Sequence, residues 1–205
     1  PLITDSQLSY WLKNEDSGST AYDFSGNSND GTINGATVDA TGLLGTTAYD
    51  YPNDGDNVNY GTITHSSDSY TYSAWLYIRG SVDFDLLIIN GYDNSATAYR
   101  IQLTDNEGEI YIGNGKNNPG YFNIGYSYNT WFLITVTYDG STLKVYRNAT
   151  EEVNSSQDLN ITGYDGAVED GQTDWQSYVT PYDGKSCYQQ LFDDALTATE
   201  VQTLY

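Results

Sequence analysis

A short polar segment near the start of the chain carries residue types that bind hard cations. Asp23, Asn27, Asn29 and Asp30 offer carboxylate and amide oxygens within eight residues. Calcium takes about six to eight such oxygens, so the spacing is compatible with a calcium site. Asp and Asn also stabilise tight turns by hydrogen-bonding to nearby backbone groups. The segment is therefore either a calcium-binding loop or a loop held together by its own side chains.

The residue types of hydrolytic chemistry are scarce. His65 is the only histidine and Cys187 the only cysteine, so no second histidine supports a catalytic triad and no His/Cys metal cluster can form. The E-x-D-x-x-E spacing that sets paired carboxylates on one strand is absent, and Glu107 and Glu109 fall in a predicted hairpin turn. We therefore expect no enzymatic activity. We also expect His65 to be a solvated loop residue and Cys187 a small buried one.

Aromatic residues are abundant, with 21 Tyr and 4 Trp. Both types combine a ring with a polar edge, which suits stacking on sugars and burial at protein interfaces. Tyr92, Asn94, Tyr121 and Trp175 lie in or beside predicted loops and are the candidate ligand-binding residues. The alternative, which explains most of the tyrosines, is that Tyr fills strand positions in a chain that lacks Met and has few Phe.

Three N-x-[ST] sequons cluster in one predicted surface segment, at Asn148, Asn154 and Asn160. Such a sequon is the acceptor for N-glycosylation, and three within fifteen residues favour an exported glycoprotein. The expected location is extracellular, on a cell surface or on a virion surface.

The element that organises the chain is a predicted β-hairpin over residues 131–147. Its first strand alternates β-branched and aromatic residues, and Asp139-Gly140 supplies the turn. A second strand of the same character covers 70–78, and we expect Trp75, Ile134 and Val136 in the core. About a dozen short strands separated by turn signals predict an all-β, two-sheet antiparallel sandwich over residues 1–205 as one domain. Residues 197–205 read as a short closing helix with a capping box.

The charge is strongly acidic, with 28 Asp and Glu against 7 Lys and Arg and a net charge of −21. Such a surface repels nucleic acid and anionic membranes, so both are excluded as partners. No run of about 18 apolar residues is present, so no membrane insertion is expected. A calcium-rich protein could have this charge, but the acids are scattered and Lys is scarce, which favours adaptation to high salt.

Five segments follow one another along nearly the whole chain. They are a Trp strand with a D-x-S-G-N…G-T loop at 8–12 and 23–32, a strand pair at 48–58, a second Trp strand at 72–76, a W…V-x-Y-D-G-x-x-L-x-x-Y hairpin at 131–146 and a closing helix at 196–205. In this order they resemble the laminin-G-like, concanavalin A-like lectin/glucanase jelly-roll family. The resemblance implies a jelly roll that closes on a short C-terminal helix.

One position departs from that family's pattern. Relatives usually carry an Asp-Asp pair eight to nine residues before the closing Leu, and in many of them the pair helps the opening-loop Asp to hold a structural calcium. Counting back from Leu196 puts Cys187 and Tyr188 there, while Asp23 remains. Calcium is thus the one cofactor that the resemblance implies, and this chain lacks part of its ligand set.

Three functions remain open. The first is a non-catalytic recognition or adhesion module, from a halophile or its virus, that binds glycans or a cell-surface protein partner. The second is a structural decoration or spike domain that packs against copies of itself or against other virion or appendage subunits without binding sugar. The third is a carbohydrate-active enzyme. The missing catalytic groups and the exposed aromatic residues favour the first.

Overall fold

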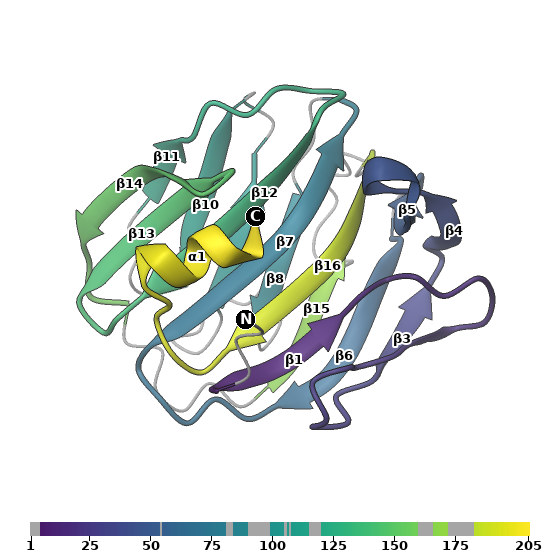
Figure 1. The fold of residues 1–205 in the computed structure, drawn as a ribbon, viewed down its shortest axis with the longest axis horizontal. Coiled ribbons are helices and arrows are strands. Elements are labelled where there is room, and N and C mark those ends of the chain that lie inside the picture. The colour runs from purple at the N-terminus through teal and green to yellow at the C-terminus, as the bar shows by residue number, and fades with distance from the viewer. Residues whose placement is uncertain are drawn as a thin grey trace.

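The computed structural model describes residues 5–53, 55–80, 84–89, 99–104, 106, 108–114, 120–159, 166–171 and 183–205. The strands form two antiparallel sheets that lie face to face, one in front of the other in Figure 1. The fold is a jelly-roll β-sandwich with one short C-terminal helix, which confirms the predicted class. Among the described residues, no helix is long and apolar enough to span a membrane.

The sheet nearer the viewer in Figure 1, called the front sheet below, contains eight strands. Seven of them follow one another across the sheet, and β1 adds to it by pairing with β16. In spatial order the strands are β14 (Thr150–Ser156), β13 (Thr142–Arg147), β12 (Trp131–Tyr138), β7 (Tyr70–Ile78), β16 (Gly184–Phe192), β5 (Thr47–Tyr51) and β4 (Thr37–Thr41), with β1 (Gln7–Trp11) beside β16.

The rear sheet also has eight strands. In spatial order they are β11 (Gly120–Asn123), β10 (Glu109–Asn114), β9 (Tyr99–Leu103), β8 (Phe84–Ile89), β15 (Gly166–Gly171), β6 (Asn57–Ile63), β3 (Gly31–Asn34) and β2 (Thr20–Ala21). Residues 33–45 contain the end of β3, all of β4 and the short 3-10 turn η1 (Leu43–Gly45).

The predicted hairpin is present as β12 and β13. Asp139 holds its turn, because its Oδ1 accepts hydrogen bonds from the backbone N–H groups of Ser141 at 2.9 Å and Thr142 at 2.7 Å. Gly140 has a φ of 87°, a left-handed conformation that glycine adopts without strain. The turn residues therefore fix the register of the hairpin as the sequence predicted.

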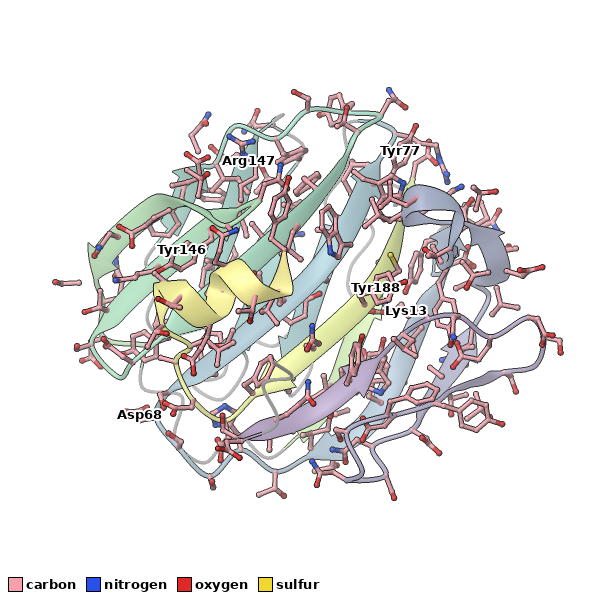
Figure 2. All side chains as sticks on the ribbon, viewed as in Figure 1. Lys13, Asp68, Tyr77, Tyr146, Arg147 and Tyr188 are labelled. Carbon is pink, nitrogen blue, oxygen red and sulfur yellow. The ribbon has the colours of Figure 1, made fainter. Side chains whose placement is uncertain are left out.

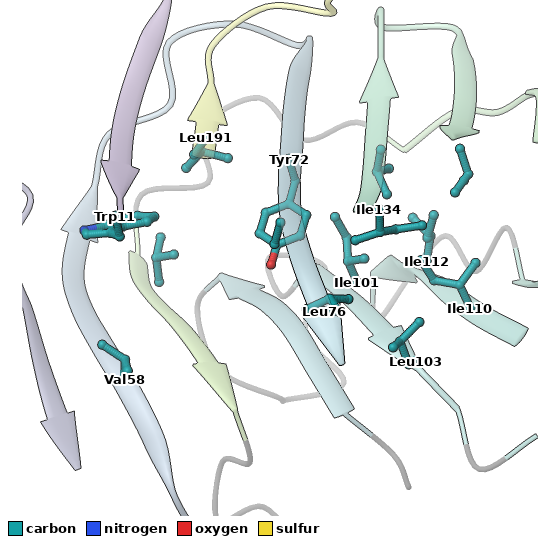
Figure 3. Close-up of a cluster of buried hydrophobic side chains, with 14 of the residues drawn as sticks. Trp11, Val58, Tyr72, Leu76, Ile101, Leu103, Ile110, Ile112, Ile134 and Leu191 are labelled. Atoms are coloured by element: carbon teal, nitrogen blue, oxygen red, sulfur yellow. The ribbon is translucent and has the colours of Figure 1, made fainter. Parts of the chain in front are cut away.

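The core lies between the two sheets and consists of side chains from both (Figure 3). Ile134 and Val136 are fully buried in it, as predicted. The prediction for Trp75 was wrong. Tyr72, Ala74 and Leu76 face the core, so Trp75 faces outward and is only half-buried. Both faces of β7 are largely covered, so apolar alternation along this strand could not distinguish the inward face from the outward one.

A second, smaller cluster covers part of the outer face of the front sheet. The helix α1 (Ala198–Leu204) lies across this face in Figure 1, and Val201 packs with Tyr146, Phe192 and Leu196. The predicted capping box is present, with the Thr197 and Glu200 side chains bonded to each other's backbone N–H groups. The helix therefore has a fixed position on the outer face of the front sheet, and it leaves the rest of that face uncovered.

His65 is buried, whereas the sequence suggested a solvated residue. Its exposed fraction is 6%, and its Nδ1 lies 3.0 Å from Oδ1 of Asp193. Asp193 also accepts hydrogen bonds from the backbone N–H groups of Ser66 and Ser67. The loop that contains His65 is therefore tied to the end of β16, a long-range contact that the local sequence does not reveal.

Candidate functional site

A groove of about 360 Å³ lies on the outer face of the front sheet. Its floor comes from four strands, and its sides come from the end of α1 and from the η1 turn. The lining residues are Gln7 and Tyr10 of β1, Trp75 of β7, Leu133 of β12, Tyr188 and Gln190 of β16, Leu43, Leu44 and Thr46 at η1, and Thr203, Leu204 and Tyr205 at the end of the chain. We call this site the aromatic groove.

Strand register brings the aromatic side chains together. Trp75 pairs with Leu133 on one side and with Cys187 on the other, and Tyr10 pairs with Gln190. Tyr205 stacks on Trp75, with ring centroids 5.6 Å apart and an angle of 21° between the planes. The rings of β1, β7, β16 and the C-terminal turn thus share one surface, although they are far apart in the sequence.

Tyr188 reaches the groove through an irregularity in β16. The register of β16 shifts between Cys187 and Gln190, and Tyr188 has a φ of 52°. A left-handed conformation is unfavourable for a residue with a large side chain, and such strain is concentrated at functional sites. Figure 2 shows Tyr188 in front of the sheet, over β16. The bulge therefore turns an aromatic ring towards the groove at the expense of local strain.

Polar groups accompany the rings. The Gln7 amide nitrogen donates a hydrogen bond to the Gln190 side-chain oxygen at 3.0 Å, which fixes two amides at one end of the groove. Partial burial, with Tyr188 and Cys187 nearby, raises the pKa of Tyr10, so its phenol stays protonated at neutral pH and can donate a hydrogen bond. The groove thus offers ring faces, amides and hydroxyl groups.

The lining side chains that the structure describes are all uncharged. Glycoside hydrolysis needs two carboxyl groups at the scissile bond, and no Asp or Glu side chain lines this groove within the described part of the chain. Ring faces bind the apolar C–H faces of sugars, and amides bind their hydroxyl groups. The arrangement is therefore suited to binding a polyhydroxylated ligand without reacting with it.

The predicted calcium segment is tied to β1 by its own side chains. Asp23 Oδ1 accepts from the N–H groups of Tyr10 at 2.8 Å and Ser25 at 2.9 Å, and its Oδ2 accepts from the N–H of Asn29 at 3.0 Å. Asp30 accepts from the N–H of Asp23. The Asn27 and Asn29 amides both donate to the Leu8 carbonyl oxygen.

The carboxylate oxygens of Asp23 and Asp30 thus already accept hydrogen bonds from backbone N–H groups. The geometry favours the alternative of a hydrogen-bonded loop. Within the described residues, no group of three or more His, Cys, Asp or Glu side chains could hold a metal ion. Calcium binding by this segment stays a prediction.

Of the four predicted ligand-binding residues, Tyr121 alone is among the described residues, and it is not part of the aromatic groove. Tyr121 lies on β11 in the rear sheet, is 62% exposed and packs against Tyr111 with ring centroids 5.2 Å apart. The Arg100 guanidinium lies 4.9 Å from the Tyr111 ring centroid. Tyr92, Asn94 and Trp175 lie outside the described residues.

Two of the predicted glycosylation sites can be placed. Asn148 follows β13 in a left-handed conformation, and its side-chain oxygen accepts a hydrogen bond from the N–H of Leu133 at 2.9 Å. Asn154 lies exposed on β14 at the edge of the front sheet, and its amide donates to Glu151 at 3.0 Å. Asn160 lies outside the described residues. Use of the sequons stays a prediction.

Sequence reasoning missed Tyr10, Trp75, Tyr188 and Tyr205 as site residues. A signal for one of them was present in the departure from the family pattern at Cys187 and Tyr188. An aromatic residue that stands where relatives have a carboxylate indicates a changed surface at that position. The other three residues could not be assigned to one site without knowing that β16 pairs with both β1 and β7.

The chain belongs to the concanavalin A-like lectin/glucanases superfamily, because a laminin G model of that superfamily matches residues 52–202. No curated protein sequence matches the chain. The match covers Trp75, Leu133 and the bulge of β16, so three of the four strands of the aromatic groove lie within the shared family region.

Solved structures of similar fold include carbohydrate-binding domains. Domain 4 of AbnA, an extracellular arabinanase of Geobacillus stearothermophilus solved with arabinotriose, has a TM-score of 0.73 at 18% identity, with 97% of this chain and 98% of that chain covered. The binding domain of botulinum neurotoxin serotype D has a TM-score of 0.74 at 15% identity, and Trypanosoma rangeli sialidase in complex with sialic acid has 0.75 at 11%. This chain spans 51% of the toxin domain and 33% of the sialidase. At these identities the likeness shows the fold alone.

Proposed function

We propose that this protein is a non-catalytic carbohydrate-binding module and that the aromatic groove binds a neutral oligosaccharide. One observation carries the proposal. Tyr10, Trp75, Tyr188 and Tyr205 form a shared ring surface beside paired glutamine amides. The volume of about 360 Å³ falls within the range of about 300–1,000 Å³ that small-ligand sites occupy.

The charge of the groove argues for a neutral ligand. Recognition of a carboxylate or sulfate group uses Arg or Lys, which present charged donors in fixed geometry. The described lining residues include neither type, and the whole chain has a net charge of −21. Of the ligands named with the similar structures, arabinotriose has only hydroxyl and ether oxygens, whereas sialic acid is an anion. The neutral ligand suits this groove better.

We further propose that the module binds without turnover and works outside the cell. The groove lacks a carboxylate pair among its described residues, which supports binding over hydrolysis. The acidic composition and the exposed sequon at Asn154 support a secreted protein, a cell surface or a virion surface of a salt-adapted organism or its virus. A cell-surface glycan is then the natural partner.

Calorimetric titration with neutral oligosaccharides in concentrated KCl tests the proposal. Arabinotriose and other neutral trisaccharides should bind more tightly than sialyllactose. Trp75→Ala should weaken binding about fivefold or more, because loss of one stacked ring is worth on the order of 1 kcal/mol. No product should appear over the same period.

Tyr121→Ala is the matched control, because this exposed aromatic residue lies on the rear sheet and outside the groove. Its binding should equal that of the unchanged protein. Equal loss in both variants, or binding that survives Trp75→Ala in a folded protein, would place the glycan elsewhere. Sugar release above buffer would overturn the non-catalytic part of the proposal.

A further inference from the structure

A polar cluster lies in the core between the two sheets, away from the aromatic groove. Lys13, labelled in Figure 2, follows β1 and is completely buried. Its Nζ contacts Oδ2 of Asp170 on β15. The same nitrogen lies 3.0 Å from the Tyr51 hydroxyl of β5 and 2.8 Å from Ser186 Oγ of β16. The Lys13 and Asp170 side chains are 0% and 2% exposed. A fully buried lysine therefore contacts an almost fully buried carboxyl group.

Burial makes the charged form of this pair unfavourable. Removing an ammonium and a carboxylate from water has a large free-energy cost, which their attraction offsets only with good geometry. Desolvation lowers the pKa of Lys13, although Asp170 opposes the shift. Transfer of one proton from Nζ to Asp170 gives a neutral amine beside a neutral carboxyl group. An unprotonated amine is the nucleophilic form of lysine.

Hydroxyl groups surround the carboxyl group of Asp170. The Tyr51 hydroxyl donates to Oδ1 at 3.0 Å, and the Tyr60 hydroxyl donates to Oδ2 at 2.9 Å. Burial raises the pKa of Tyr60 well above its usual value, so its phenol remains a donor. Donors fixed on both oxygens stabilise the negative charge that develops when a nucleophile adds to the carbonyl carbon.

A short hydroxyl chain joins the amine to the far carboxyl oxygen. Lys13 Nζ donates to Ser186 Oγ at 2.8 Å, Ser186 Oγ lies 3.3 Å from the Tyr51 hydroxyl, and that hydroxyl donates to Asp170 Oδ1. A proton can pass along such a chain from nitrogen to oxygen. Glu15 is also buried, and its carboxylate raises the pKa of Lys13. The Tyr49 hydroxyl donates a hydrogen bond to Oε2 of Glu15.

We propose that Lys13 and Asp170 condense spontaneously to form an intramolecular amide cross-link. Nζ of Lys13 attacks Cγ of Asp170, and a C–N bond forms. The Cγ–Oδ2 bond then breaks, and Oδ2 leaves as water with two protons that originate on the amine and the carboxylic acid. Nothing is oxidised or reduced, and no co-reactant is needed. The dry core favours condensation because the product amide carries no charge.

The cross-link joins two residues that are 157 positions apart and ties the segment after β1 in one sheet to β15 in the other. A covalent bond between distant residues restricts the unfolded chain, as a disulfide does. This chain has a single cysteine and cannot form an internal disulfide. An amide bond would give a surface-exposed binding module the same protection in any redox environment.

Intact mass spectrometry of the full chain, refolded in concentrated KCl and then denatured, tests the proposal. The measured mass should lie below the sequence mass by one water, about 18 Da. Tryptic digestion should leave Lys13 uncleaved and yield a branched peptide that contains both Lys13 and Asp170. A full sequence mass in protein that melts cooperatively overturns the proposal.

Variants separate this cross-link from other losses of water. Lys13→Met should have its full mass, and Asp170→Asn should lose ammonia, about 17 Da, in place of water. Lys144→Met is the matched control, because Lys144 forms a half-exposed pair with Glu151, and it should keep the loss of water. Dehydration that persists in Lys13→Met belongs to another site, such as an Asp-Gly step, and overturns the assignment. Tyr51→Phe and Ser186→Ala should lower the cross-linked fraction after a fixed refolding time.

Discussion

Tyr188 has a strained backbone conformation and its ring lines the aromatic groove. Substitutions can separate the effect of the strain on stability from the effect of the ring on binding. Glycine accepts a φ of 52° without penalty and removes the ring, whereas alanine removes the ring and keeps most of the strain. We predict that Tyr188→Gly binds glycan as weakly as Tyr188→Ala but is at least as stable. Thermal melting and calorimetric titration measure the two effects. If Tyr188→Gly is clearly the less stable variant, the ring stabilises the fold by more than the strain opposes it.

Cys187 is buried next to Tyr188, and desolvation raises the pKa of its thiol to about 11. The unfolded thiol ionises near its ordinary value of about 8.5. The stabilising contribution of this group is therefore complete below that pH and is lost as the pH rises towards 11. We predict that stability falls between about pH 7.5 and 9.5, and falls less in Cys187→Ala. Urea unfolding at both pH values checks this, and equal falls in both proteins would contradict it.

At the scale of elements, the loop over residues 23–30 depends on one carboxylate. Asp23 accepts hydrogen bonds from the N–H groups of Tyr10, Ser25 and Asn29. We predict that Asp23→Ala lowers the free energy of unfolding by about 1–3 kcal/mol, because these donors lose their acceptor. Asp23→Asn, which keeps one oxygen, should lose less.

The same loop tests the calcium alternative. If hydrogen bonds alone hold it, the melting temperature of the unchanged protein should be the same with added calcium and with EDTA. A rise with calcium that Asp23→Ala abolishes would establish the metal site that the family resemblance implied. The two measurements thus decide between the alternatives that the sequence left open.

Local chemistry made most elements predictable. Asp139-Gly140 specified the β12–β13 turn, Thr197 and Glu200 specified the start of α1, and residues 70–78 are a strand with the predicted bounds. The strands β3 and β4 are hard to predict because polar and small residues give them little apolar alternation. They exist because they pair with β6 and β5, which is a property of the sheet and not of the segment.

The candidate site was less predictable than the elements that form it. Trp75 and Leu133 become neighbours only through the β7–β12 register, and Tyr10 joins them only because β1 pairs with β16. Tyr205 reaches Trp75 only because α1 docks on the outer face. The residue types suggested that aromatic side chains bind the ligand, but the position of the site could be found only from the order in which the strands pair.

At the scale of the whole molecule, several of the described basic side chains form ion pairs with acidic residues. Arg79 forms ion pairs with Asp50 and Asp183, Arg147 pairs with Glu152, and Lys13 pairs with Asp170. With 28 acids against 7 bases, the excess carboxylates must repel one another across the surface. The folded state brings these charges closer together than the unfolded chain does, so low salt should destabilise it.

We therefore predict that the melting temperature rises with KCl concentration. The Debye length falls from about 10 Å at 0.1 M to about 3 Å at 1 M, so screening should produce most of its effect below about 1 M. A rise that continues linearly to about 3 M would indicate salt exclusion from apolar surface in addition to screening.

A variant in which several exposed Asp residues are changed to Asn, for example Asp16, Asp39 and Asp68, is the matched control. It should melt higher than the unchanged protein in low salt and show a smaller rise with KCl. A flat or falling trend in the unchanged protein would refute the salt-adaptation hypothesis, because the net charge of −21 would then have no measurable energetic consequence.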